Sequence, residues 1–288
     1  MLCHSRGRAI LLWLALAFAS ELSTGGAKAD CGPDTKCGVV DIPYPFSMQD
    51  GCAMTDDCKN DSKPFSASYE VLSISLQLSQ LRLLSPISSS CYDTTSHAME
   101  DTRWFRHSDT GNKFTVIGCR TLAYITNWDV KYMSGCVSAC WQADITSATN
   151  GSCSGIGCCQ TAIPKDLQNY TVFFSKSLNT SASIYNATRC SYAVLMDSSD
   201  FKFSTSYLPS PEFNTSYGGR APMLLDCAIR TANNCEEAQK NLTSYACKSD
   251  SSECFNSSNG PGYICNCTKG YQGNPYRQNG CQEKENAL

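Results

Sequence analysis

Nineteen cysteines follow an N-terminal segment with the features of a cleavable export signal, and this combination restricts the possible folds more than any other feature of the chain. Arg6 and Arg8 precede an apolar run over residues 9–19, and residues 27–29 read Ala-Lys-Ala, the small-x-small pattern of a cleavage site. A membrane-spanning helix needs about 20 apolar residues, and this run is only half as long. We therefore predict a signal peptide over residues 1–29.

The cysteine count has a second consequence, because exported thiols are normally used in disulfides rather than in metal or redox chemistry. The sequence holds 20 cysteines, of which only Cys3 lies in the signal. The remaining number is odd, so one thiol is left over or pairs with another molecule. No later stretch is long and apolar enough to cross a bilayer. We therefore expect a soluble, extracellular protein without a transmembrane segment of its own.

Charge and histidine content argue against several classes of function. Residues 1–29 contain three of the 23 basic and one of the 26 acidic side chains, which leaves a net charge of −5 and no positive field for nucleic acid. Only His97 and His107 remain, and neither lies in a recognisable nucleophile or metal arrangement. Scattered carboxylates leave a glycosidase pair open, but we expect no enzyme, no metal and no cofactor.

Acceptor triplets for N-linked glycosylation, Asn-x-Ser/Thr, occur nine times after the signal. In an exported chain they predict a heavily glycosylated surface. Asn266 is the least secure acceptor, because it lies between Cys265 and Cys267, where a disulfide knot can block the transferase. The acceptors are Asn60, Asn150, Asn169, Asn179, Asn186, Asn214, Asn241, Asn256 and Asn266.

Six cysteines from Cys235 to Cys281 form the most legible module. Two of them stand in a Cys-x-Cys pair, and Gly-Tyr-Gln-Gly follows at residues 270–273. This pattern resembles an EGF-like domain, and the resemblance implies the pairs Cys235–Cys254, Cys247–Cys265 and Cys267–Cys281. A unit this short cannot bury enough apolar surface to fold alone. Its disulfides, which contribute about 2–4 kcal/mol each, are therefore its main source of stability. Residues 231–234 offer no carboxylate for calcium, and we expect no tight calcium binding and a spacer role.

A phrase near the start of the mature chain points to one family. Residues 37–46 read CGVVDIPYPF, and Gly-Cys follows shortly afterwards. The two prolines exclude a helix and favour a short edge strand with Ile42, Tyr44 and Phe46 on one side. The phrase resembles the N-terminal galacturonan-binding domain of plant wall-associated receptor kinases, with Ser47 in place of the usual Gly.

Further phrases of that family keep the same order along the chain. They are an alternating, strand-like run at 71–78, CSGIGCCQ at 153–160 and Gly-Asn-Pro-Tyr at 273–276. The resemblance therefore covers the whole mature chain. The usual Trp after Leu225-Asp226 is Cys227 here. Setting it aside leaves an even number of cysteines before the EGF-like module, so Cys227 is our candidate for the unpaired thiol, either buried and inert or in an intermolecular disulfide.

Full receptors of this family continue into a transmembrane helix and a kinase, so the resemblance implies an ectodomain alone. No glycine-rich phosphate loop, His-Arg-Asp or Asp-Phe-Gly motif occurs in the chain. We predict an all-β, disulfide-rich fold of small cysteine-crosslinked β modules followed by the EGF-like domain. The expected divisions are 30–120 for a galacturonan-binding-like domain, 121–230 for a second cysteine-rich module, 235–281 for the EGF-like domain and 282–288 for a tail. No Pro/Gly linker marks the boundary between residues 120 and 121.

The resemblance also implies binding of pectin or oligogalacturonides in the cell wall and apoplast. Planar Arg side chains bind carboxylates with two parallel hydrogen bonds, while aromatic rings cover the apolar face of a sugar. Because the net charge is negative, contact requires a local basic patch, and the run at residues 103–107 with Lys113 is the best candidate. The predicted contact residues are Arg103, Trp104, Arg106 and Lys113.

Other interpretations remain open. The run at 103–107 can instead be a strand with one buried aromatic face and two solvated arginines. At the level of function, the chain can be an interaction module that pairs with receptor ectodomains as a decoy or co-receptor, or a disulfide-rich defence protein or inhibitor. At the level of localisation, it can be membrane-associated through a receptor partner or as a truncated single-pass receptor.

Overall fold

The computed structural model describes residues 35–46, 58–59, 63–66, 68–91, 94–102, 105–140, 145–178 and 188–284. The predicted signal peptide lies outside these ranges, as do Cys31, Cys52, Arg103, Trp104, Asn60, Asn179 and Asn186. In the described part, no helix is long and apolar enough to cross a bilayer.

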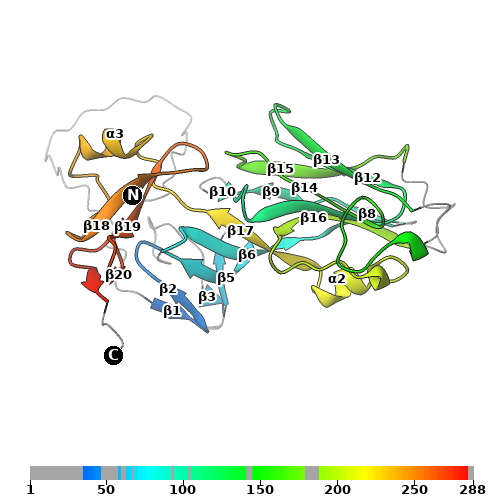
Figure 1. The fold of residues 1–288 in the computed structure, drawn as a ribbon, viewed down its shortest axis with the longest axis horizontal. Helices are drawn as coiled ribbons and strands as arrows, with labels where there is room; N and C mark the ends of the chain where they lie inside the picture. The colour runs from blue at the N-terminus through cyan, green and yellow to red at the C-terminus, as the bar shows by residue number, and fades with distance from the viewer. Residues whose placement is uncertain are drawn as a thin grey trace, which may run out of the picture.

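Three antiparallel sheets form the main scaffold (Figure 1). The six-stranded sheet has the order β10-β17-β6-β5-β4-β3, with β3 at Cys58–Lys59, β4 at Lys63–Ser66, β5 at Tyr69–Ser75, β6 at Gln80–Pro86, β10 at Arg106–His107 and β17 at Arg220–Asp226. The five-stranded sheet has the order β14-β11-β16-β7-β8, with β7 at Ser88–Cys91, β8 at Thr95–Ser96, β11 at Asn112–Ile117, β14 at Cys158–Thr161 and β16 at Cys190–Asp197. The four-stranded sheet has the order β13-β12-β15-β9, with β9 at Met99–Asp101, β12 at Thr121–Thr126, β13 at Met133–Ser138 and β15 at Asn169–Phe174.

Smaller elements complete the described chain. β1 (Thr35–Cys37) pairs with β2 (Val40–Ile42) near the N-terminal end. The EGF-like unit, residues 235–284, contains the hairpin of β18 (Ser252–Asn256) and β19 (Tyr263–Cys267) and that of β20 (Tyr271–Gly273) and β21 (Cys281–Glu283). The helices are short and comprise η2 (Ile145–Ser147), η3 (Thr205–Tyr207), α2 (Glu212–Ser216) and α3 (Cys235–Gln239). Figure 1 shows the EGF-like unit at one end of the long axis.

Strand β16 lies between two cores, because successive side chains of a strand point to opposite faces. Ala193 and Leu195 belong to the first core, which also contains side chains of β6, β12, β15 and β17. Tyr192, Val194 and Met196 belong to the second core, which the segment around η3 and α2 closes (Figure 1). The unbroken apolar run of this strand is therefore explained by burial on both faces.

The three main sheets run across the division expected at residues 120/121. Each of the three main sheets combines strands from before and after that boundary, as in the pairs β6 with β17 and β11 with β16. Neighbouring strands share their hydrogen bonds, so the two expected modules cannot fold apart from one another. The segment from β1 to β17 forms one scaffold.

The all-β, disulfide-rich prediction is confirmed, with eight disulfides among the described residues. Five bridges lie in the scaffold, namely Cys37–Cys58, Cys91–Cys190, Cys119–Cys140, Cys136–Cys159 and Cys153–Cys158. The EGF-like unit has Cys235–Cys254, Cys247–Cys265 and Cys267–Cys281, which are the pairs that the resemblance implies. The longest loop is closed between β7 and β16, and chain entropy makes a bridge of that span worth about 4–5 kcal/mol.

Cys227 directly follows β17 and packs in the first core, where it is 9% exposed. Its backbone N–H donates to the Ser79 carbonyl at 2.8 Å. This burial favours the inert packing role over an intermolecular disulfide, and the assignment as unpaired thiol stays a prediction.

The Pro-Tyr-Pro phrase departs from the expected edge strand. β2 ends at Ile42, because Pro43 and Pro45 have no N–H to continue a ladder. The Phe46 N–H instead closes a turn to the Pro43 carbonyl at 2.8 Å. Ile42 and Phe46 are buried in the first core, whereas Tyr44 packs with the EGF-like unit. The three apolar side chains therefore do not share one side.

Candidate functional site

The residues predicted for polysaccharide contact do not form one site among the described residues. Lys113 is exposed on β11 of the five-stranded sheet, whereas Arg106 lies on β10 at the edge of the six-stranded sheet. Arg106 is only 5% exposed, and its Nε donates to the carboxylate of Asp166. Both interpretations of the run place this guanidinium in solvent, and its burial corrects them. Arg103 and Trp104 lie outside the described residues.

Arg106 belongs to the junction that fixes the EGF-like unit on the scaffold. Asn259, in the turn between β18 and β19, is 1% exposed. Its Nδ2 donates to the His107 carbonyl at 3.0 Å and to the Asp226 carboxylate at 2.8 Å, and its Oδ1 accepts from the Asp166 N–H at 2.7 Å. One amide of the EGF-like unit thus holds three scaffold segments together, with its donors and its acceptor satisfied.

A second group of contacts at the junction involves Tyr44. The Asn274 Nδ2 donates to the Tyr44 carbonyl at 2.7 Å, and the Arg277 guanidinium carbon lies 5.3 Å from the centre of the Tyr44 ring, which is a cation–π distance. Tyr44 and Leu76 of the scaffold pack in the same cluster as Tyr263 of the EGF-like unit. The Gly-Asn-Pro-Tyr phrase therefore joins the two parts of the chain.

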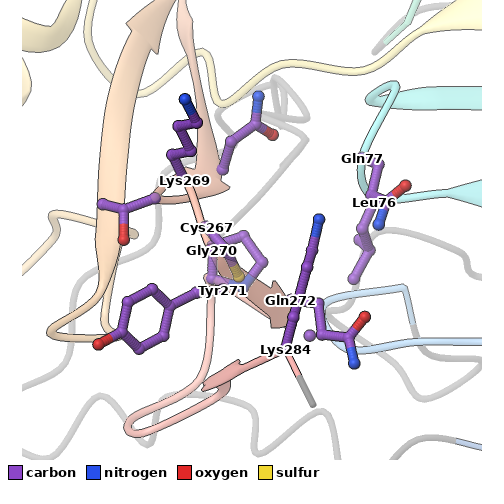
Figure 2. A pocket seen from close by; sticks show the side chains of 12 residues that line it. Leu76, Gln77, Cys267, Lys269, Gly270, Tyr271, Gln272 and Lys284 are labelled. Carbon is purple, nitrogen blue, oxygen red and sulfur yellow. The ribbon is translucent and has the colours of Figure 1, made fainter. Parts of the chain in front are cut away.

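A pocket of about 300 Å³ lies where the EGF-like unit meets the scaffold (Figure 2). The turn between β19 and β20 and the segment after β21 form one wall, and the turn between β5 and β6 forms the other. Figure 2 shows Lys284 between the scaffold side chains Leu76 and Gln77 and the ring of Tyr271. The lining residues are Leu76, Gln77, Asn266, Cys267, Thr268, Lys269, Gly270, Tyr271, Gln272, Gly273, Pro275 and Lys284.

Backbone hydrogen bonds hold two lysines at this pocket. Lys269 stands in the turn that the Tyr271 N–H closes to the Thr268 carbonyl at 3.0 Å. The Lys284 N–H donates to the Gly270 carbonyl at 2.8 Å, which returns Lys284 to the side of the same turn. Gly270 has a φ of +92°, and no atom lies within 4 Å of a Cβ built there, so backbone conformation rather than crowding favours glycine.

A tight turn sets the scaffold wall. The Ser79 N–H donates to the Leu76 carbonyl at 3.2 Å, and the Leu78 N–H donates to the Ser75 Oγ at 3.2 Å. Leu76 packs against the core of the EGF-like unit, whereas the neighbouring Gln77 is exposed at the pocket. The wall therefore combines an apolar anchor with a free amide.

The lining suits an anionic, hydroxyl-rich ligand. Lys269 and Lys284 are both exposed, and the lining contains no carboxylate. Neither lysine takes part in an ion pair with another described residue. The amides of Gln77 and Gln272 supply donors and acceptors for hydroxyl groups, and Tyr271 supplies a ring. The pocket can therefore bind a carboxylate and contact the rest of a sugar.

The largest pKa shifts occur in the core, away from this pocket. Burial raises the pKa of Glu100 to about 7, and it lowers the pKa of His107 to about 3. Both side chains are 0% exposed, so neither is accessible to a ligand and we assign both to stability. In the described ranges, no group of three His, Cys, Asp or Glu side chains is placed to hold a metal.

The pocket could not be predicted from a local pattern, because its walls come from segments that are distant in sequence. The available signal is local, a lysine two residues before an aromatic residue in the Thr-Lys-Gly-Tyr turn after Cys267. That turn lies in the module expected to act as a spacer. Its lysine therefore indicates a binding site only once the structure shows the scaffold beside it.

Comparisons with known proteins agree on one family. The chain is 32% identical to wall-associated receptor kinase 5 of Arabidopsis thaliana, over 96% of this chain and 37% of that protein. It is 32% identical to wall-associated receptor kinase 2 over 92% of this chain and 36% of the relative, and 30% identical to wall-associated receptor kinase 1 over 94% and 38%. No family model and no solved structure matches. The chain spans little more than a third of the length of these relatives, and wall-associated receptor kinases are its homologues over most of its length.

Proposed function

We propose that this chain is a non-enzymatic extracellular protein of the plant cell wall that binds acidic pectic polysaccharide. The pocket at the EGF-like unit takes a galacturonate carboxylate between Lys269 and Lys284. One observation carries this assignment, namely two exposed lysines on a pocket whose lining has no carboxylate. The family membership is consistent with it, since the relatives are named for their association with the wall.

Each proposed contact between a pocket lysine and a galacturonate carboxylate is weak, and retention on the polymer increases because the carboxylate is repeated along it. Exposed charge pairs contribute about 0.2–1 kcal/mol each and are screened by salt. De-esterified pectin presents a carboxylate on each residue, so an immobilised polymer engages many protein molecules and allows each to rebind. Retention is therefore expected to fall as salt rises and to be lost when the carboxylates are esterified.

The test is retention of the secreted, oxidised protein on immobilised polygalacturonate at low ionic strength. Replacement of both pocket lysines by glutamine, K269Q/K284Q, removes the charge and keeps side chains of similar length. The matched control is K176Q/K202Q, which removes two exposed lysines from the scaffold. We expect the double pocket variant to be retained several-fold less than the wild-type protein, and K176Q/K202Q to be retained equally well.

Two negative results have different meanings. Equal retention of the double variant and the wild type removes the pocket from the site while leaving pectin binding in place. Equal retention of the wild type on polygalacturonate, on fully esterified pectin and on a neutral glucan contradicts the function itself. Asn266 lines the pocket and is a glycan acceptor, so its occupancy is measured by mass spectrometry on the same sample. A glycan there in all molecules would fill the pocket and contradict the assignment.

A further inference from the structure

Exposed apolar side chains gather on the outer face of the four-stranded sheet. Met99 is 63% exposed, Met133 61%, Val137 49% and Phe173 37%, and Trp128 in the turn between β12 and β13 is 51% exposed. Large apolar patches on soluble proteins normally mark a surface that something covers. Figure 1 shows that β12, β13 and β15 form an outer layer of the molecule.

The register of the strands places these residues on one face. Tyr124 of β12 is opposite Phe173 of β15, and their rings stack with centres 5.4 Å apart. Tyr124 is also opposite Gly135 of β13, where a Cβ would lie 2.9 Å from the Tyr124 Cβ, so the glycine leaves room for the ring. Neighbours that point the other way, such as Ile125 and Val172, are fully buried in the first core. The apolar stripe is therefore a consequence of strand alternation.

Asn169 lies on the same face, at the first position of β15. Strand alternation puts Asn169, Thr171 and Phe173 on one side, with Thr171 about 7 Å and Phe173 about 13 Å away along the strand. The Asn169 Oδ1 accepts a hydrogen bond from the Trp128 N–H at 2.9 Å. This bond fixes the amide beside the exposed indole residue and leaves its Nδ2 without a hydrogen-bond partner among the described residues.

Asn169 differs from the other glycan acceptors in these surroundings. Asn150, Asn241 and Asn256 are exposed, and Asn214 is half-buried, but none is on the four-stranded sheet. Among the acceptors that the structure describes, Asn169 alone is on the apolar face of the four-stranded sheet.

We propose that Asn169 carries an N-linked glycan whose first sugars lie over Trp128 and the outer face of the four-stranded sheet. Transfer forms a bond between the Asn169 Nδ2 and C1 of N-acetylglucosamine from a lipid-linked oligosaccharide pyrophosphate donor. The lipid pyrophosphate leaves with the electrons of the C1–O bond, and one Nδ2 proton is lost to a base.

The chemistry of the face matches this occupant. A pyranose ring has C–H groups on one side, which pack on aromatic and thioether surface, and hydroxyl groups at its rim, which stay in water. A neutral glycan also avoids the cost of burying charge. Because the glycan is tethered at the edge of the patch, it covers the patch without the loss of translational freedom that a separate partner incurs.

The first measurement is the occupancy of Asn169 in the protein secreted from a eukaryotic host, read by glycopeptide mass spectrometry. We expect occupancy in most molecules. Asn169 unoccupied in the folded, oxidised protein would overturn the proposal.

The second measurement compares two variants at one position. T171A destroys the acceptor triplet and keeps the Asn169 amide beside Trp128, while T171S keeps the triplet. We expect T171A to bind an apolar dye such as anilinonaphthalene sulfonate several-fold more, and its tryptophan fluorescence to be quenched more by acrylamide. The control N241Q removes an exposed acceptor in the EGF-like unit and should change neither value.

The remaining outcomes decide between occupants. Equal dye binding by T171A and T171S would show that the glycan does not cover the face. A glycosylated T171S protein that is dimeric in solution, with this face protected from hydrogen exchange, would assign the face to a second copy and overturn the proposal. If T171A is not secreted, enzymatic removal of the glycans from the folded T171S protein gives the same comparison.

Discussion

The buried carboxyl of Glu100 provides a quantitative test of the scaffold interior. Glu100 lies on β9 with 0% exposure, and the Ser85 Oγ donates to its Oε1 at 3.1 Å. Its Oε2 has no hydrogen-bond partner in the described part of the chain. Burial raises the pKa of Glu100 from 4.5 to about 7, and hydrogen bonds from Tyr69 and Ser85 offset only part of this effect. The carboxyl is therefore protonated in the folded protein at pH values where it is ionised in the unfolded chain.

The sign of the effect follows from the two pKa values. Because the folded pKa is the higher one, the stability that Glu100 contributes is fully present below pH 4.5 and is lost as the pH rises through 7. At about 1.4 kcal/mol per pKa unit, this interval corresponds to about 3 kcal/mol. Replacement by the amide, E100Q, keeps the shape and removes the titration. The free energy of unfolding of E100Q relative to wild type should therefore rise by about 3 kcal/mol from pH 4.5 to pH values above 7.

His107 also changes the pH dependence of stability, so the effect of Glu100 must be measured as the difference between E100Q and the wild type. It is completely buried with its ring 4.9 Å from that of Tyr170, and burial lowers its pKa from 6.5 to about 3. Its contribution to stability is present above pH 6.5 and is lost as the pH falls toward 3. From pH 4.5 to 6.5 the slopes due to Glu100 and His107 oppose each other. The wild-type protein should have a nearly constant stability there, whereas that of E100Q should increase with pH.

The assay is unfolding in guanidinium chloride with the disulfides intact, followed by tryptophan fluorescence at each pH. The control is E253Q, which makes the same substitution at an exposed glutamate on β18. An E100Q difference that stays constant across this range would refute the assignment of Glu100 as a buried, protonated acid.

Two further predictions concern the EGF-like unit. N259A removes three buried or partly buried hydrogen bonds at the junction and should cost about 3 kcal/mol of docking free energy. Hydrogen exchange should then increase in the β18–β19 turn and β10 while all three bridges of the unit persist, and unchanged exchange would contradict the role of Asn259. In G273A a Cβ would lie 2.1 Å from the Gly280 carbonyl oxygen at a φ of +122°, so secretion and formation of the Cys267–Cys281 bridge should fail. G270A, with similar φ but open space, should be milder, and equal behaviour of the two variants would refute the crowding argument.

Local patterns in the sequence predicted the features that depend on local chemistry. The alternation at residues 71–78 gave a strand that the structure has at Tyr69–Ser75, where the turn that sets the pocket wall begins. The spacing from Cys235 to Cys281 gave the EGF-like pairing through the family resemblance. The pairing of the scaffold cysteines could not be predicted from the sequence. Cys91, for example, lies opposite Cys190 only because of the register between β7 and β16.

Arg106 shows why the burial of one predicted contact residue could not be inferred from the local sequence. An arginine in a run of charged and aromatic residues is normally solvated, and only a partner from elsewhere in the chain can make its burial favourable. That partner, Asp166, lies in the loop before β15 and is itself held by Asn259 of the EGF-like unit. Three segments that are distant in sequence thus determine whether the Arg106 side chain is buried, and no local sequence pattern contains that information.

The same junction links ligand binding to the position of the EGF-like unit. The pocket walls belong to two bodies, with Gln77 on the scaffold and Lys269 on the unit. A ligand that contacts both walls binds only the docked arrangement, and at a concentration 100-fold above its Kd it adds about 2.7 kcal/mol to docking. Conversely, an undocked fraction raises the apparent Kd in proportion. If the pocket binds galacturonate as proposed, N259A should weaken retention on polygalacturonate although Asn259 is not part of the lining, and addition of oligogalacturonide should reverse part of its excess hydrogen exchange. Weaker retention without that reversal would mean that the variant damages the unit itself, and the thermodynamic link would then be refuted.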